Sequence, residues 1–274
     1  MATIGFIDAL MQGRLPVLEW AKDAFTGEAA GGYHSGLYLT GTPGAGSVSA
    51  NGVNGAIVSN GRSGTVAAPA AAAGKSCWLN WSDWAPLAAT PNVDFGFWVD
   101  RLWDNSGLSV TTAPGAQAIV PATLPPRDAN MSTAGVGVGL AVEISTVTGN
   151  GAPVVATIVY TNSSGVAGRS TTVTIPATAV AGTWLPISLA AGDYGVQGPT
   201  SFALASTLTS GALSLVMYRV LGRKLRALPG GGIDSFSMAD GGHAIPDGTA
   251  PHMIYHLTGT AVVATHATIE FAQA

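Results

Sequence analysis

The sequence has few of the residues that carry chemistry. Of its 274 residues only 9% are charged, the formal net charge is −4, and Cys77 is the one cysteine. A single cysteine excludes an internal disulfide and is typical of a chain made in a reducing cytoplasm. The negative balance argues against binding to the phosphates of nucleic acid. We therefore expect neither a disulfide-stabilised module nor a nucleic-acid-binding protein.

Long apolar runs are also missing, although 47% of the residues are apolar and the mean hydropathy is +0.35. No uninterrupted run approaches the roughly 20 residues of a membrane-spanning helix. The first residues lack the basic start and apolar run of a signal peptide. Interface cores are depleted of charge, so this composition favours a soluble chain that buries surface against other subunits, with no membrane partner.

Strand signals dominate what is present. Alternating or apolar runs are separated by short turns, and 37 glycines supply the backbone freedom that tight turns need. No long helix interrupts this pattern between residues 135 and 219. The sequence therefore predicts an all-β protein, with a jelly-roll-like β-sandwich domain over 77–274. The clearest strand signals are Leu140–Ser145, Val154–Tyr160, Arg169–Ile175 and Leu213–Arg219.

Residues 1–76 are predicted to form an N-terminal arm of two short helices and an extended segment rich in glycine and alanine. Apolar residues repeat at helical spacing in the first helix, and Pro16 can begin the second, with Leu18, Ala21 and Phe25 as its stripe. The arm either covers one end of the sheets or contacts a neighbouring subunit. The residues predicted for a subunit interface are Phe6, Ile7, Leu10, Met11, Trp20 and Phe25.

Aromatic residues gather just after this arm, where five of the seven tryptophans lie between residues 77 and 104. Tryptophan is enriched at interface hot spots. It is also a large core residue. The cluster can therefore form a local core, anchor a protein interface or stack against a glycan. Its members are Trp78, Trp81, Trp84, Trp98 and Trp103.

Five segments together resemble a family of tailed-bacteriophage virion structural proteins. They are Arg101–Gly107, Leu124–Asp128, Tyr160–Arg169, Ala191–Gln197 and Leu215–Arg219. The relatives usually carry arginine where this chain has Gln197. The resemblance does not extend to residues 1–76.

The resemblance implies a virion component, made in the bacterial host cytoplasm and bound to other virion proteins. The first expectation is a head decoration (cement) protein that contacts the major capsid protein, with a homo-oligomer, preferably a trimer, as its assembly. The alternative is a tail or baseplate component, including a receptor- or glycan-binding module.

Three groups of polar residues are candidate sites. Asp94, Asp100 and Asp104 lie near the tryptophans, as carboxylates of a glycan-cleaving enzyme would. Short acidic residues are also common in turns, and we expect no enzyme.

Histidines offer a weak metal pattern. His252 and His256 fall on one face of a predicted strand, and His266 and His243 could add ligands. These histidines are better explained as separate residues on a virion surface or at a subunit contact, so we expect no metal and no cofactor. The third group is a basic cluster that fits an acidic patch on a neighbouring subunit, a solvated loop or, less well, packaged DNA. It consists of Arg219, Arg223, Lys224 and Arg226.

Overall fold

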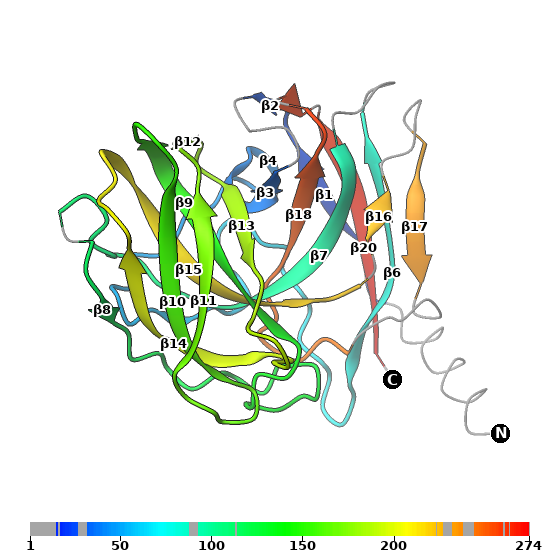
Figure 1. Cartoon of the computed structure of the whole chain (residues 1–274). Helices are drawn as coiled ribbons and strands as arrows, with labels where there is room; N and C mark the ends of the chain where they lie inside the picture. The colour runs from blue at the N-terminus through cyan, green and yellow to red at the C-terminus, as the bar shows by residue number, and fades with distance from the viewer. Residues whose placement is uncertain are drawn as a thin grey trace.

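The computed structural model describes residues 15, 17–26, 32–87, 93–112, 114–222, 224–226, 232–237, 244–259, 261–262 and 264–273 (Figure 1). Over these residues the chain has twenty strands and one short 3-10 helix, η1 (Gly36–Tyr38). The predicted all-β class is therefore confirmed. No helix in the described part of the chain is long and apolar enough to cross a membrane.

The centre of the molecule is a closed ring of six antiparallel strands. Pairing runs from β9 through β13, β3, β18, β7 and β15, and β15 pairs with β9 again. Closure pairs each strand on both sides, so this ring has no open edge strand. The bounds are β9 (Val138–Gly149), β13 (Thr183–Ile187), β3 (Tyr33–Ser35), β18 (Pro251–Leu257), β7 (Val93–Asp104) and β15 (Ser210–Val220), with β12 (Thr178–Ala179) on β9, and β5 (Ala56–Ile57) and β16 (Leu225–Arg226) on β7.

A four-stranded sheet packs against the β9–β15 side of the ring, in front of it in Figure 1. Buried and outward residues alternate along its strand β10, so one face is apolar and the other faces solvent. The apolar core between the two layers includes Ile158, Phe202, Val142 and Leu215. The strand order is β11 (Arg169–Ile175), β10 (Val154–Asn162), β14 (Val196–Leu204) and β8 (Gln117–Ala118).

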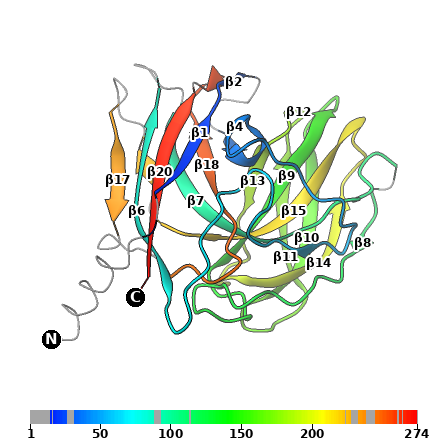
Figure 2. The same cartoon turned by 180° about the vertical axis from the view of Figure 1, so that it is seen from behind.

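A five-stranded sheet covers the opposite side of the ring and faces the viewer in Figure 2. Its core with β7 and β18 is rich in aromatic residues, including Trp20, Trp84, Trp98 and Tyr255. The order is β17 (Asp234–Ser237), β6 (Cys77–Pro86), β20 (Thr265–Gln273), β1 (Leu18–Lys22) and β4 (Gly41–Thr42). A separate two-stranded sheet pairs β2 (Phe25–Thr26) with β19 (Ala261–Val262).

The inside of the ring has its own core. Inward side chains from its strands, among them Val99, Trp184, Val216 and Ile254, pack together there. Layers packed face to face fit the predicted sandwich character. A jelly roll, however, divides eight strands between two sheets. The described strands instead place a closed ring between two flanking sheets.

Two predictions about the N-terminal region are wrong for the residues described. Leu18–Lys22 is strand β1, not a helix, because Trp20 and Lys22 are buried while Ala21 between them is only half-buried and Glu19 is exposed, a period of two rather than 3.6. It pairs with β20 along its whole length. The first predicted helix, with Phe6, Ile7, Leu10 and Met11, lies outside the described residues.

The described part of 1–76 is also not an arm separate from the domain. Strand β3 sits within the ring between β13 and β18. Further along, Val58 N–H donates to the Leu102 carbonyl at 2.9 Å and Val66 N–H to the Pro251 carbonyl at 2.8 Å. The glycine- and alanine-rich segment is therefore part of the fold, because its backbone N–H groups donate hydrogen bonds to the ring.

Candidate functional site

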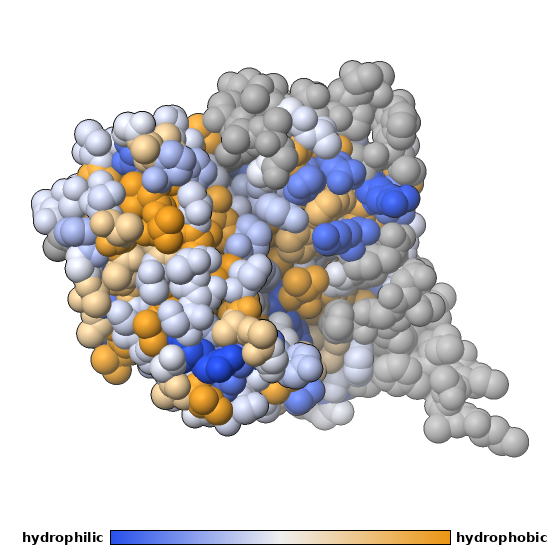
Figure 3. Space-filling view, in the orientation of Figure 1, coloured by the Kyte–Doolittle hydropathy of each residue, from blue (hydrophilic) through white to orange (hydrophobic). Residues whose placement is uncertain are grey.

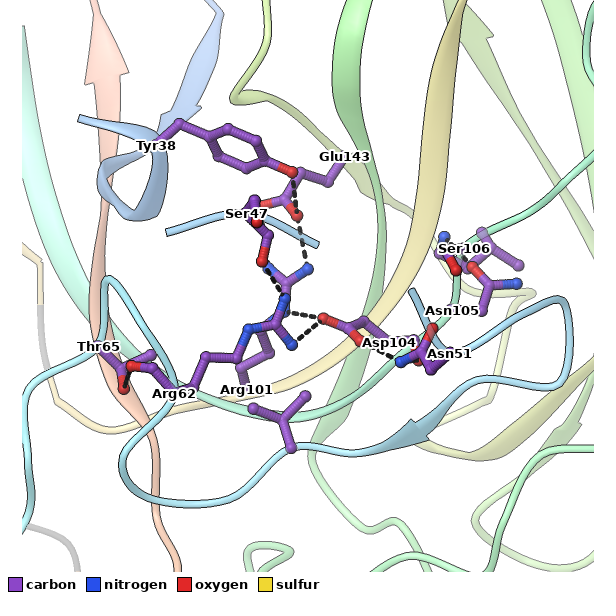
Figure 4. A network of polar contacts seen from close by, with 12 residues as sticks. Tyr38, Ser47, Asn51, Arg62, Thr65, Arg101, Asp104, Asn105, Ser106 and Glu143 are labelled. Atoms are coloured by element: carbon purple, nitrogen blue, oxygen red, sulfur yellow. Dashed lines mark hydrogen bonds and ion pairs between the residues drawn. The ribbon is translucent and has the colours of Figure 1, made fainter. Parts of the chain in front are cut away.

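The most concentrated group of polar side chains is a buried ion-pair cluster in the ring (Figure 4). Arg101 from β7 binds Glu143 from β9 through two hydrogen bonds, Nη1 to Oε1 at 2.9 Å and Nη2 to Oε2 at 2.6 Å. Both side chains are fully buried. This two-point geometry is the strongest form of an arginine–carboxylate pair.

Asp104, at the end of β7, joins the same cluster. Its carboxylate accepts hydrogen bonds from Arg101 Nε at 2.8 Å, Arg62 Nη1 at 2.5 Å and Asn51 Nδ2 at 2.8 Å. Arg62 also donates to the Ser47 carbonyl at 2.5 Å. The segment between residues 47 and 62 is therefore held against the ring by the hydrogen bonds that Asn51 and Arg62 make to Asp104.

The neighbouring carboxylates favour the charged form of Arg101. Burial alone would lower the pKa of Arg101, but Glu143 and Asp104 raise it above its ordinary value. Tyr38 donates to Glu143 at 3.4 Å, and burial together with that negative charge raises the pKa of Tyr38. Hence neither the guanidinium nor the phenol is set to exchange a proton near neutral pH.

A second buried group surrounds Asp100, one residue before Arg101. Asp100 Oδ1 accepts the Ala250 N–H at 2.9 Å, and its Oδ2 lies 3.6 Å from Arg127 Nε. Burial raises the pKa of Asp100 to about 6 although Arg127 opposes the shift. Arg127 donates to the Gly248 and Val58 carbonyls, so this group also ties distant segments together.

A third group lies at the loop end of the four-stranded sheet. Asp193 accepts hydrogen bonds from Tyr160 Oη at 2.6 Å, Asn162 Nδ2 at 2.7 Å and Arg169 Nε at 2.9 Å. These bonds lower the pKa of Asp193 to about 2, with those from Tyr160 and Asn162 contributing most. We call this group the Asp193 clasp, because it joins the 190–195 loop to the β10–β11 hairpin.

None of these groups has the arrangement of a hydrolytic or metal centre. Asp100 and Asp104 are fully buried beside arginines, while Asp94 is exposed and lies 3.5 Å from His256. Among the described residues no group of three or more histidine, cysteine or acidic side chains could hold a metal ion. A polar hollow of about 310 Å³, lined partly by Asn51, Arg62 and Asp104, lies over the first cluster.

The structure separates the predicted aromatic cluster into two sets. Trp84, Trp98 and Trp103 are fully buried, so these three belong to the core and present no platform for a glycan. Trp78 and Trp81 on β6 are half-buried. The interface prediction for Trp20 is wrong for the isolated chain, because its ring is fully buried and its indole N–H donates to Tyr255 Oη at 2.7 Å.

The predicted basic cluster is also divided. Arg219 is buried and donates to the Asp128 carbonyl at 3.2 Å and the Ala244 carbonyl at 3.1 Å, so it is not a surface charge. Lys224 Nζ lies 4.2 Å from the centre of the Phe95 ring. Arg226 is exposed. Arg223 and the side chain of Phe25 lie outside the described part of the chain.

The histidines do not come together. His252 is fully buried beside Trp184 inside the ring, whereas the His256 ring stacks on Phe95 with 4.7 Å between centroids. His266 Nε2 lies 3.3 Å from Glu19 across strands β20 and β1. His243 is outside the described residues.

Sequence reasoning missed Glu143, Arg62 and Arg127. A signal existed for Glu143, which is the one charge in the apolar run Leu140–Ser145, because a charge at such a position is seldom buried without a partner. No local pattern indicates that its partner is Arg101.

No protein-family model and no curated protein matches the sequence. Among solved structures, a VP2 subviral particle of infectious bursal disease virus aligns over 94% of this chain and 80% of that chain, with 10% identity and a TM-score of 0.17. A mutant VP2 from T=1 particles of the same virus aligns over 97% and 83%, with 13% identity and a TM-score of 0.19. Similarity at this level does not establish a shared fold.

Proposed function

We propose that this chain is a non-enzymatic structural component of a virus particle, from a tailed bacteriophage. The observation that carries the proposal is where the phage-like segments fall in the fold. They supply Arg101 and Asp104 of the first cluster, Asp193 of the clasp, and the buried Arg219. A resemblance in residues that hold the fold together supports a shared architecture with those virion proteins.

The state of the polar groups supports the absence of catalysis. A catalytic carboxylate needs access to substrate and a pKa matched to its role. Asp104 is fully buried and accepts hydrogen bonds from two arginines, and Asp100 is fully buried as well. Burial raises the pKa of the Cys77 thiol to about 11, which disfavours the nucleophilic thiolate.

Within that class we propose a head decoration protein that binds the major capsid protein and assembles as a trimer. The surface supports subunit contacts. Val147 and Val155 are 51% and 41% exposed, and an apolar area lies over the β9–β10 side of the molecule (Figure 3). Each 100 Å² of apolar contact contributes about 2.5 kcal/mol before ordering costs.

Copy number is the decisive test of the decoration role. Quantitative mass spectrometry of purified particles would compare this chain with the major capsid protein. A ratio near one to one or one to three is expected. A handful of copies per particle would overturn the decoration role and favour the tail or baseplate alternative. Absence from particles would overturn the virion assignment itself.

Oligomeric state is tested separately on the purified chain. Light scattering coupled to size-exclusion chromatography is expected to give three times the mass of 27.4 kDa. A monomer that stays monomeric when mixed with capsids lacking the protein, and does not bind them, would contradict both the trimer and the capsid contact.

A further inference from the structure

A neutral hollow of about 270 Å³ lies at the loop end of the four-stranded sheet, away from the buried ion pairs. Its walls come from four separate segments of the chain: the 121–124 segment, the loop that carries Thr133, the end of β10 and the start of β14. No charged side chain lines it. This volume is close to the lower limit of small-molecule sites, so it suits one ring-sized ligand.

The polar side chains in this hollow are available to bind a ligand. Four hydroxyls and one carboxamide line it, and none of these side chains makes a hydrogen bond to another described residue. A hydroxyl both donates and accepts, and a carboxamide offers both kinds of group, so together they complement a ligand that itself donates and accepts without charge. The five residues are Thr123, Thr133, Thr161, Gln197 and Thr200.

Apolar atoms complete the hollow. Pro121 and Leu124 line it, and Leu124 is only 3% exposed. An apolar wall beside neutral hydrogen-bonding groups matches the two sides of a sugar ring, which carries C–H groups on its faces and hydroxyls around its rim. Specific orientation in such sites comes from a small number of placed polar groups.

The segments that form the hollow are held in place without a ligand. Asp128 Oδ2 accepts from Ser132 Oγ at 2.7 Å and Val136 N–H at 3.0 Å, which orders the loop that carries Thr133. Ile119 N–H donates to the Thr200 carbonyl at 3.0 Å. The Asp193 clasp orders the loop before Gln197. A site fixed in advance loses less entropy when it binds.

From these contacts we propose that the hollow binds one residue of a neutral saccharide. Thr161 and Gln197 supply hydrogen bonds to its hydroxyls, and Leu124 and Pro121 contact its C–H face. The site is independent of the virion role, since a decoration protein and a tail protein could each carry it. We expect acidic sugars not to bind, because no cationic side chain lines the hollow to pair with their carboxylate.

The test is ligand-observed NMR with the full chain and a panel of single sugars. The neutral probes are methyl α-glucoside, methyl β-galactoside, methyl α-mannoside and N-acetylglucosamine, and galacturonic acid is the charged comparison. We expect at least one neutral probe to bind and galacturonic acid not to bind. Thr161→Val and Gln197→Leu should each weaken that binding about ten-fold, the effect of one lost hydrogen bond.

Thr157→Val is the matched control. Thr157 lies on the same strand and face as Thr161, outside the hollow, and its hydroxyl is likewise uncommitted within the described chain. Binding should be unchanged in this variant, and melting temperatures should confirm that all three variants fold. The proposal is overturned if no neutral probe binds, if Thr161→Val binds as the wild type does, or if galacturonic acid binds equally well.

Discussion

Single charged residues carry much of the specificity inside this protein. Arg101, Asp104 and Glu143 are fully buried, in a chain with few charges. Two buried charges lose their hydration, so such a pair adds little net stability compared with an apolar pair of the same size. Removing one partner is costly, however, because the other charge stays buried alone. We infer that these pairs specify which strands meet.

Glu143→Gln tests this at one residue. The substitution keeps the shape but removes the charge opposite Arg101, and we expect the free energy of unfolding to fall by about 3 to 5 kcal/mol. Chemical denaturation measures it. Glu19→Gln is the control, since Glu19 pairs with His266 at the surface and should cost less than about 1 kcal/mol. Equal losses in the two variants would contradict the role of the buried pair.

Asp193 should make stability depend on acid pH. Its pKa is about 2 in the folded chain against an ordinary 3.8, so the folded state binds this proton less readily than the unfolded state. The contribution of Asp193 is therefore complete above about pH 4 and is lost as pH falls through about 2. Melting temperatures of the wild type and Asp193→Asn should differ at pH 5 and converge near pH 2.

Tyr160→Phe gives an internal check on that prediction. It removes the hydrogen bond of 2.6 Å to Asp193 while keeping the aromatic ring, so the acid-dependent part of the stability should shrink without disappearing. An acid profile identical to that of the wild type would mean that the Tyr160 bond does not lower the pKa.

At the scale of elements, loops at the end of the four-stranded sheet are joined backbone to backbone. Val136 and Gly195 form an isolated β-bridge, and Gly137 N–H donates to the Tyr194 carbonyl at 2.8 Å. Gly135 has a φ of +79°, and a Cβ there would overlap the Val196 carbonyl oxygen. Glycine is therefore required at this crossing for two reasons, its backbone conformation and its lack of a side chain.

Gly135→Ala and Gly165→Ala separate these two reasons. Gly165 has nearly the same φ, +80°, but a Cβ there would have no heavy atom within 4 Å. We expect Gly165→Ala to cost about 1 kcal/mol, the conformational term alone. Gly135→Ala should lower the free energy of unfolding by about 1 to 3 kcal/mol more than Gly165→Ala does, because the backbone around Val196 must move. Denaturant unfolding compares them, and equal costs would show that the loop crossing yields easily.

At the scale of the whole molecule, the closed ring is the part that both flanking sheets depend on. One core joins it to the four-stranded sheet, a second joins it to the five-stranded sheet, and a third fills its interior. The flanking sheets do not share a core cluster. Opening the ring must therefore expose all three cores, whereas loss of an outer strand exposes part of one.

Native-state hydrogen exchange should show this order. We expect the amides of Val99, Ala141 and Val216 in the ring to exchange only through global unfolding. The free energy of that unfolding is on the order of 5 to 15 kcal/mol for a stable domain. Amides of the outer strand β11 should exchange at lower free energy. Ring amides that exchange more easily than those of β11 would contradict the central role of the ring.

The strands themselves could be read from the sequence because their signals are local. Val154–Tyr160 and Arg169–Ile175 are among the clearest strand signals of the sequence, and the structure pairs the two ranges residue by residue as β10 and β11. The same reasoning failed at Leu18–Lys22, where five residues are too few to distinguish a helical stripe from alternation. Partners decided that segment, since β20 supplies its hydrogen bonds.

What the sequence by itself determined is the all-β class, most of the main strands and the scarcity of reactive groups. These follow from periodicity, turn residues and composition, each of which acts over a few neighbouring positions. Only the tertiary structure decided ring closure, the burial of Trp84, Trp98 and Trp103, and the pairing of Arg101 with Glu143. These depend on contacts between segments distant in the chain, 42 positions apart for that ion pair, which no local pattern encodes.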